Sequence, residues 1–132
     1  MRSFHAPAPS RLRRYHADIG IPPGIEYPTS GTTLTYTVHA YQAVAKSNIA
    51  HMLPKALPPH TLVEVTALGR TPVQWVVRCR IDSARDVVLV VTNEYLVKTV
   101  WVNQHNDLHA TLDRTKYDRP GEEEHRHHQH QQ

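Results

Sequence analysis

The fold is decided by residues 61–103, TLVEVTALGRTPVQWVVRCRIDSARDVVLVVTNEYLVKTVWVN. This stretch contains four runs rich in β-branched and aromatic residues, at 61–68, 73–81, 87–92 and 95–103. The breaks between the runs are short and polar. Such connections favour antiparallel hairpins, because a parallel crossover needs about a dozen residues. The stretch therefore predicts a four-stranded antiparallel sheet.

Alternation within the runs predicts which faces of this sheet are buried. In the run 73–81, Trp75, Val77 and Cys79 share one face, and mainly polar and basic residues share the other, which is typical of a sheet with one solvent-facing side. The run VVLVV at 87–91 is apolar on both faces and indicates a central strand. Cys79 is the one cysteine of the chain, so it has no intramolecular partner and is expected in the core.

A helix is expected before the sheet. Between residues 39 and 53, Tyr41, Val44 and other apolar residues recur at helical spacing, and Pro54 ends the pattern. The short alternating run at 33–37 predicts a strand or an extended lead-in. With a single helix available to cover the sheet, the predicted fold class is α+β, one main helix packed on a four-stranded antiparallel sheet.

The two ends of the chain differ from its middle. Residues 1–30 hold five prolines and few large aliphatic residues, so we expect a proline-rich basic arm without regular elements. Residues 121–132, GEEEHRHHQHQQ, form a polar low-complexity tail that is expected to be disordered. The α+β domain itself is predicted to span residues 31–120.

Length, hydropathy and charge limit the classes of protein to which this chain can belong. A chain of 132 residues fits one domain. It has neither an apolar run long enough to span a bilayer nor the apolar stretch of a secretory signal, so a cytoplasmic protein is expected. Its net charge is +3, and residues 1–120 alone carry +5, from 14 basic and 9 acidic residues. A basic body favours polyanionic partners such as nucleic acid.

Basic side chains on the predicted helix and sheet are candidates for phosphate chemistry. His39 and Lys46 are seven residues apart, so a helix would place them on one face. An imidazole titrates near neutral pH and an ammonium group binds phosphate, which suits attack on a phosphodiester. Arg78 and Arg80 share a sheet face, where they could flank one phosphate. The alternative is that all four are solvated surface residues.

A second cluster of polar residues follows the last predicted strand. His105, Asp107 and His109 alternate there, but without a further matched ligand the pattern favours a hydrogen-bonded turn over a zinc site. The histidines of the tail would bind metals only adventitiously. The chain also lacks a phosphate-binding glycine loop, a nucleophile elbow and a cysteine cluster. No metal and no cofactor are therefore expected.

The order of elements resembles the RelE/ParE-like group of small toxin and nuclease domains, with the barnase, EndoU and colicin-type nucleases. In the uncharacterised bacterial and phage members that the chain most resembles, a Y-x-x-H-A motif opens the helix and a V-x-T-V strand closes the sheet. The matching positions here are Tyr36, His39 and Ala40, then Val97, Thr99 and Val100. The resemblance covers roughly residues 33–103, and the segment DLHATLDRTKY resembles extensions in phage-encoded members.

This resemblance implies metal-independent cleavage of RNA, or inhibition of a cellular machine by members that no longer cleave. It implies that His39 is the general acid or base, that Lys46 with Arg78 or Arg80 holds the phosphate, and that Thr99 orients it. The helix of the group often carries an arginine pair where this chain has a single lysine. A lysine lacks the bidentate fork of a guanidinium, so phosphate capture would be weaker.

The second hypothesis is a non-catalytic phage protein that binds a host or virion protein. Its partner would dock on the sheet face or along the arm of residues 1–30, where Ile19, Ile21, Ile25 and Tyr27 supply apolar side chains. The expected partners are thus RNA or a host protein, and no membrane. The oligomeric state stays open.

Overall fold

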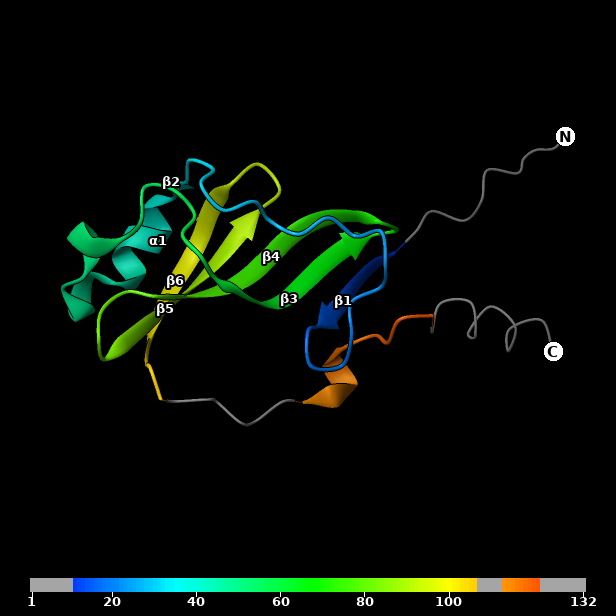
Figure 1. The fold of residues 1–132 in the computed structure, drawn as a ribbon. Helices are drawn as coiled ribbons and strands as arrows, with labels where there is room; N and C mark the ends of the chain where they lie inside the picture. Colours follow the sequence, from blue (N-terminus) through cyan, green and yellow to red (C-terminus); the bar gives the residue numbers. More distant parts are fainter. Residues whose placement is uncertain (1–10, 107–112, 122–132) are drawn as a thin grey trace, which may run out of the picture.

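The computed structural model describes residues 11–106 and 113–121 (Figure 1). The strands form one six-stranded sheet in the order β1-β3-β4-β5-β6-β2. Every neighbouring pair is antiparallel except β2 and β6, which are parallel, so the sheet is mixed. The strands are β1 Leu12–His16, β2 Thr35–Tyr36, β3 Thr61–Leu68, β4 Thr71–Arg80, β5 Arg85–Thr92 and β6 Leu96–Gln104. Of these, β3 to β6 lie where the alternation predicts strands.

The predicted class of one main helix on a four-stranded antiparallel sheet is wrong. The helix α1, Val38–Ala43, has only six residues, and it is followed by two 3₁₀ turns, η1 Ala45–Ser47 and η2 Ala50–Met52. Thr37 caps α1, because its Oγ1 accepts a hydrogen bond from the Ala40 N–H. Between the two turns Asn48 has a φ of 55°, a left-handed conformation that ends right-handed helical geometry.

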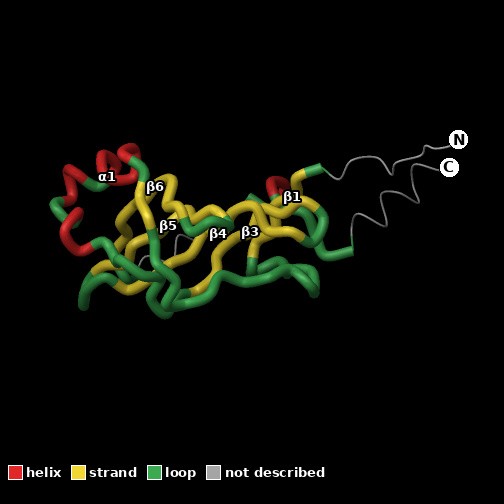
Figure 2. The backbone as a smooth tube through the Cα atoms, turned by 90° about the horizontal axis from the view of Figure 1, so that it is seen from above, coloured by secondary structure: helices red, strands yellow, loops and turns green. Residues whose placement is uncertain are grey.

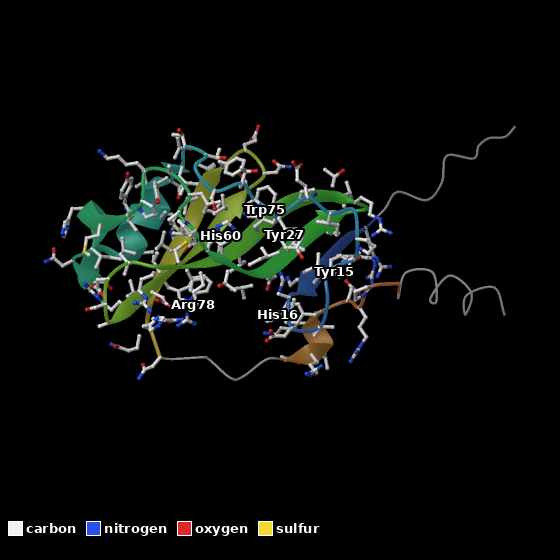
Figure 3. The ribbon with its side chains drawn as sticks, viewed as in Figure 1. Tyr15, His16, Tyr27, His60, Trp75 and Arg78 are labelled. Carbon is white, nitrogen blue, oxygen red and sulfur yellow. The ribbon has the colours of Figure 1, made fainter. Side chains whose placement is uncertain are left out.

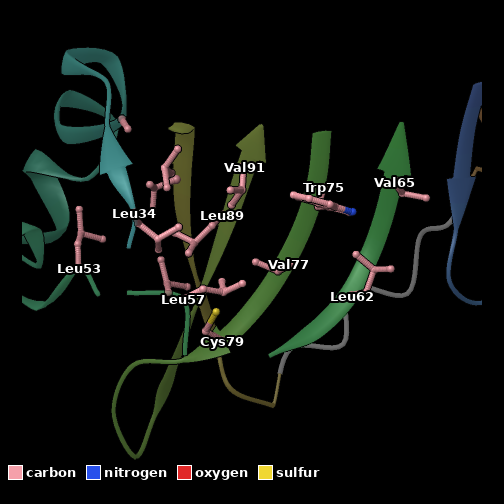
Figure 4. Close-up of a cluster of buried hydrophobic side chains, with 14 of the residues drawn as sticks. Leu34, Leu53, Leu57, Leu62, Val65, Trp75, Val77, Cys79, Leu89 and Val91 are labelled. Atoms are coloured by element: carbon pink, nitrogen blue, oxygen red, sulfur yellow. The ribbon is translucent and has the colours of Figure 1, made fainter. Parts of the chain in front are cut away.

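The hydrophobic core lies on one face of the sheet, and extended segments do most of the covering. Leu34 and Leu57 pack against Leu89 of β5 (Figure 4), and Ile25 and Leu53 belong to the same cluster. The helix α1 buries only one residue, Ala40. Figure 2 shows α1 and the 3₁₀ turns gathered at one end of the strands, with loops running along one side of them. A short helix at the end of a sheet cannot cover it alone.

Cys79 is in the core, as predicted. Burial, and then the negative charge of Asp86, raises the pKa of its thiol to about 12. The side chain therefore stays a protonated thiol at neutral pH, and it acts as a small apolar residue, since only the thiolate is reactive.

A strand forms within residues 1–30, where no regular element is predicted. This strand, β1, pairs with β3, and Tyr15 lies opposite Val65 in the core. Arg13 also is buried, with its Nη1 3.2 Å from Asp118 Oδ1. The prediction rested on the prolines and on the scarcity of large aliphatic residues. It is wrong because Tyr15 enters the core and the charge of Arg13 is balanced by a carboxylate far along the chain.

Asp118 closes the outer edge of β1. Its N–H donates to the Arg14 carbonyl at 2.7 Å, and its Oδ2 accepts from the Arg14 N–H at 3.3 Å. Its Oδ1 pairs with Arg13 and, at 3.5 Å, with Arg11. An exposed edge strand leaves backbone groups open to pairing with another chain, and Asp118 satisfies two of them here.

We expect Asp118→Ala to lower the free energy of unfolding by about 2 kcal/mol, because charged hydrogen bonds to the backbone and to the buried Arg13 are lost. Urea denaturation measures this as a lower midpoint at unchanged slope. The matched control is Asp113→Ala, which removes only the exposed cap of the 3₁₀ turn η3, Arg114–Lys116. Equal losses in the two variants would show that closing the β1 edge contributes little.

In the described part of the chain, no helix is long and apolar enough to cross a membrane. The predicted tail beyond Gly121 and the residues Asp107 and His109 of the weighed zinc pattern lie outside the described residues. The apolar residues of the predicted arm are partly committed to the fold itself: Ile25 is in the core, and Ile21 packs against it.

Candidate active site on the outer face of the sheet

The side of the sheet opposite the core, called here the outer face, has its own pattern of side chains. Val76, Val88 and Val90 form a second apolar cluster on it, separate from the core, and Val63 packs against them. Register places Arg78 opposite Val88, and Val88 opposite Trp101 of β6. Residues directly opposite one another in antiparallel strands point to the same face. Arg78 and Trp101 therefore lie on the outer face.

At one end of the outer face, three cationic or titratable side chains surround a single carboxylate. Register places Arg80 opposite Asp86. Arg78 Nε donates to Asp86 Oδ2 at 2.7 Å, and His105 Nδ1 lies 2.9 Å from Asp86 Oδ1. Arg80 Nε is 3.6 Å from the same Oδ1. We call Arg78, Arg80, Asp86 and His105 the Asp86 cluster; in Figure 3 its member Arg78 lies well apart from Tyr15 and His16 of β1.

A tight hairpin turn between β4 and β5 sets Arg80 opposite Asp86. Asp82 Oδ1 accepts hydrogen bonds from the N–H groups of Ala84 and Arg85 at 2.9 and 2.8 Å. The guanidinium of Arg85 then binds Asp82 Oδ2 with two donors. Aspartate commonly forms this kind of turn with its own backbone. The far side of the cluster is fixed by the His105 N–H, which donates to the Ala84 carbonyl at 2.7 Å.

The carboxyl group of Asp86 is ionised at neutral pH although it is only 6% exposed. Desolvation by burial favours its neutral form, but the hydrogen bonds and charges of Arg78 and His105 outweigh that effect and lower its pKa. Two guanidinium groups around one carboxylate leave an excess of positive charge at this end of the sheet. Arg80 and His105 are about half exposed and accessible to an anionic ligand.

The contacts of His105 define which ring nitrogen is basic. An ionised carboxylate only accepts hydrogen bonds, so Nδ1, which faces Asp86, carries the proton. The lone pair is then on Nε2, which contacts Arg80 Nη2. A carboxylate that holds an imidazole in one tautomer, with the lone pair on the other nitrogen, is the arrangement of a general base and its orienting group. Here that lone pair accepts a hydrogen bond from Arg80, which has to turn away before Nε2 can take a proton.

The structure separates the residues that the sequence proposes for catalysis. Arg78 and Arg80 lie together in the Asp86 cluster, and Thr99 lies opposite Val90 on the same outer face. His39 is exposed on α1, which packs on β6 and inserts Ala40 into the core side. Lys46 is exposed on η1, and because no continuous helix links it to His39, the two do not share a helix face.

Asp86 and His105 are the site residues that sequence reasoning missed. Asp86 belongs to the predicted break between two strands, and nothing local shows that it is buried and faces Arg78. His105 appears in the sequence only as part of the alternating pattern weighed for zinc. Among the described residues, no group of three His, Cys, Asp or Glu side chains is placed to hold a metal ion. The register of β4, β5 and the end of β6 is the information that would have identified the site, because it brings these residues together.

No family model, curated protein or solved structure matches this chain. The resemblance to the RelE/ParE-like group stays a prediction.

Proposed function

We propose that this protein binds RNA on the outer face of its sheet and cleaves it at the Asp86 cluster without a metal ion. The observation that carries the proposal is His105, held by the buried Asp86 on one nitrogen and facing Arg80 with the other. An oriented base beside guanidinium groups supplies the two things that attack on a phosphodiester needs, proton removal and stabilisation of negative charge.

The proposed reaction is attack by a ribose 2′-hydroxyl on the adjacent phosphorus. His105 Nε2 takes the hydroxyl proton while the bond from O2′ to phosphorus forms. The bond from phosphorus to the 5′ oxygen breaks, and that oxygen takes a proton from water. The products are a 2′,3′-cyclic phosphate and a free 5′-hydroxyl. Arg80, which is half exposed, turns from His105 to the phosphate oxygens, and Arg78 adds its charge from the same side.

The proposal keeps part of what the resemblance implies and reassigns the rest. RNA stays the substrate, and Arg78 and Arg80 stay the phosphate-binding pair. Thr99 loses the role of orienting the phosphate, because its partner Val90 is four residues from Asp86 along β5, about 13 Å away. The general base moves from His39 to His105, since the helix that carries His39 packs on the other side of the sheet.

The test is cleavage of an end-labelled single-stranded RNA by the purified full chain in excess EDTA. We expect His105→Ala to lower the cleavage rate by about a hundredfold or more, which is typical for loss of a general base. The matched control, His51→Ala, changes an exposed histidine on η2 and should cleave like the wild type. RNA with 2′-O-methyl groups should not be cut, because it has no attacking hydroxyl.

Two results would contradict the proposal. Wild-type protein that cuts no RNA would rule out cleavage as its function. Loss of cleavage in His39→Ala, with full activity in His105→Ala, would place the base on α1 and overturn the assignment to the Asp86 cluster.

A further inference from the structure

We propose that Trp101 is a stacking platform for a nucleobase, so that the outer face takes single-stranded and not duplex RNA. This inference rests on the proposed function and names its substrate class. The chain has two tryptophans with opposite surroundings: Trp75 is 3% exposed in the core, and its Nε1 donates to the Glu26 carbonyl, whereas Trp101 is 42% exposed on the outer face. A large aromatic surface held in water on a rigid strand is available to a ligand.

The side chains beside Trp101 suit a base more than an apolar partner. Thr99 and Asn103 lie two residues before and after it on β6, and register places both on the outer face, opposite Val90 and Asp86. Residues two apart on a strand are about 7 Å apart. A hydroxyl and an amide at this distance from the indole can bond to the edge of a base that stacks on it, which is how single-stranded RNA is commonly recognised.

Positive charge lies on both sides of Trp101. The Asp86 cluster, with Arg80, is at one end, one row of side chains away. At the other end is Lys98 of β6. It is the extra residue of a β-bulge, because Val90 and Val91 of β5 pair with Thr99 and Val97 and leave Lys98 unpaired. Its Nζ reaches across to Gln74 Oε1 on β4, at 3.2 Å. A nucleic acid strand that follows β6 would therefore meet a cation before and after the stacked base.

Glu64, an acidic residue opposite Val76 on the outer face, does not oppose this path. Glu64 on β3 accepts a hydrogen bond from the Tyr117 hydroxyl at 2.9 Å, and its other oxygen lies 3.6 Å from Arg14 Nε. Its charge is thus partly balanced by Arg14, and β3, which carries Glu64, lies two strands away from β5. The part of the outer face along β6 therefore keeps the positive charge that a phosphate backbone needs.

The platform selects for single strands because of how bases are packed. In a duplex both faces of each base are covered by its neighbours, so a side chain on a flat sheet cannot reach them. Stacking on an aromatic ring needs an unpaired base and is tolerant of sequence. It does not need the 2′-hydroxyl, so single-stranded DNA should bind without being cut.

The test is titration of the full chain with a single-stranded DNA oligonucleotide, which cannot be cleaved through a 2′-hydroxyl. The fluorescence of Trp101 should be quenched on binding, whereas the fluorescence of the buried Trp75 should not. We expect Trp101→Ala to weaken binding about tenfold or more, the loss typical of one stacked base. Trp101→Phe should retain most of the affinity. Tyr27→Ala, which removes a 53% exposed ring, is the matched control and should bind normally. Tyr27 follows Glu26, whose carbonyl binds Trp75 on the core side of the sheet.

The outcomes separate this inference from the proposed function. Equal affinity for a duplex of the same sequence, or unchanged binding by Trp101→Ala, would overturn the platform. Failure to bind any oligonucleotide would do the same and would leave the outer face as a surface for a protein partner. Binding that depends on Trp101 in a protein that cuts no RNA would support the platform and reject only the cleavage.

Discussion

Asp86→Asn should lower the free energy of unfolding by about 3 kcal/mol at pH 7, because removing one partner of a buried ion pair leaves the other charge uncompensated. The carboxylate that is lost is itself buried, and it holds Arg78 at 2.7 Å and His105 at 2.9 Å. Urea or guanidinium denaturation of both proteins measures the difference.

The difference should depend on pH in one direction. The pKa of Asp86 is lower in the folded protein than its ordinary value of about 3.9, so folding is favoured wherever the carboxyl is ionised. The contribution is complete above about pH 5 and is lost as the pH falls through the folded pKa. The gap in stability between wild type and Asp86→Asn should therefore narrow as the pH falls below about 4. The same substitution at Asp82, in the exposed hairpin turn, should have a smaller effect. A gap that does not narrow as the pH falls below about 4 would show that the charge of Asp86 is not its cause.

The same variant should lose RNA cleavage by a hundredfold or so if the proposed function holds, because an amide no longer enforces the tautomer in which His105 Nε2 is basic. At a pH and temperature where Asp86→Asn is fully folded, its binding of single-stranded DNA should persist. That split between binding and rate distinguishes lost catalysis from lost structure.

Leu57→Ala should cost about 3 kcal/mol of unfolding free energy, as large-to-small substitutions in a core do. Leu57 is 1% exposed and lies in the same core cluster as Leu89, to which it contributes from an extended segment. Its backbone is tied on both sides: its N–H donates to the Thr32 carbonyl at 2.8 Å, and its carbonyl accepts from the Gly31 N–H at 2.7 Å. The segment therefore cannot easily collapse to fill the cavity.

The matched control for this variant is Leu68→Ala, the same substitution at a leucine that is 44% exposed at the end of β3. It should change stability by about 0.5 kcal/mol or less, as is usual for surface positions. Denaturant midpoints at equal slopes compare the two. A small loss in Leu57→Ala would mean that the extended segments are not the true cover of the core.

Local sequence patterns predict one part of the candidate site and not the rest. Alternation along residues 73–81 puts Arg78 and Arg80 on one face, and the structure agrees with that local periodicity. It cannot show that Asp86 and His105 meet them, because those contacts depend on the register of β4, β5 and β6 together. The pairing of His39 with Lys46 assumes a continuous helix, which is interrupted at Asn48.

The strands β3 to β6 follow from local patterns, since period-two alternation and short polar breaks are properties that hairpins preserve. The other elements depend on tertiary contacts. β1 forms because Tyr15 enters the core and the buried Arg13 meets Asp118, 105 residues away. The six-residue α1 and the extended segments cover the core in place of a long helix. In each case the deciding free energy comes from contacts between residues distant in the chain, which no local pattern records.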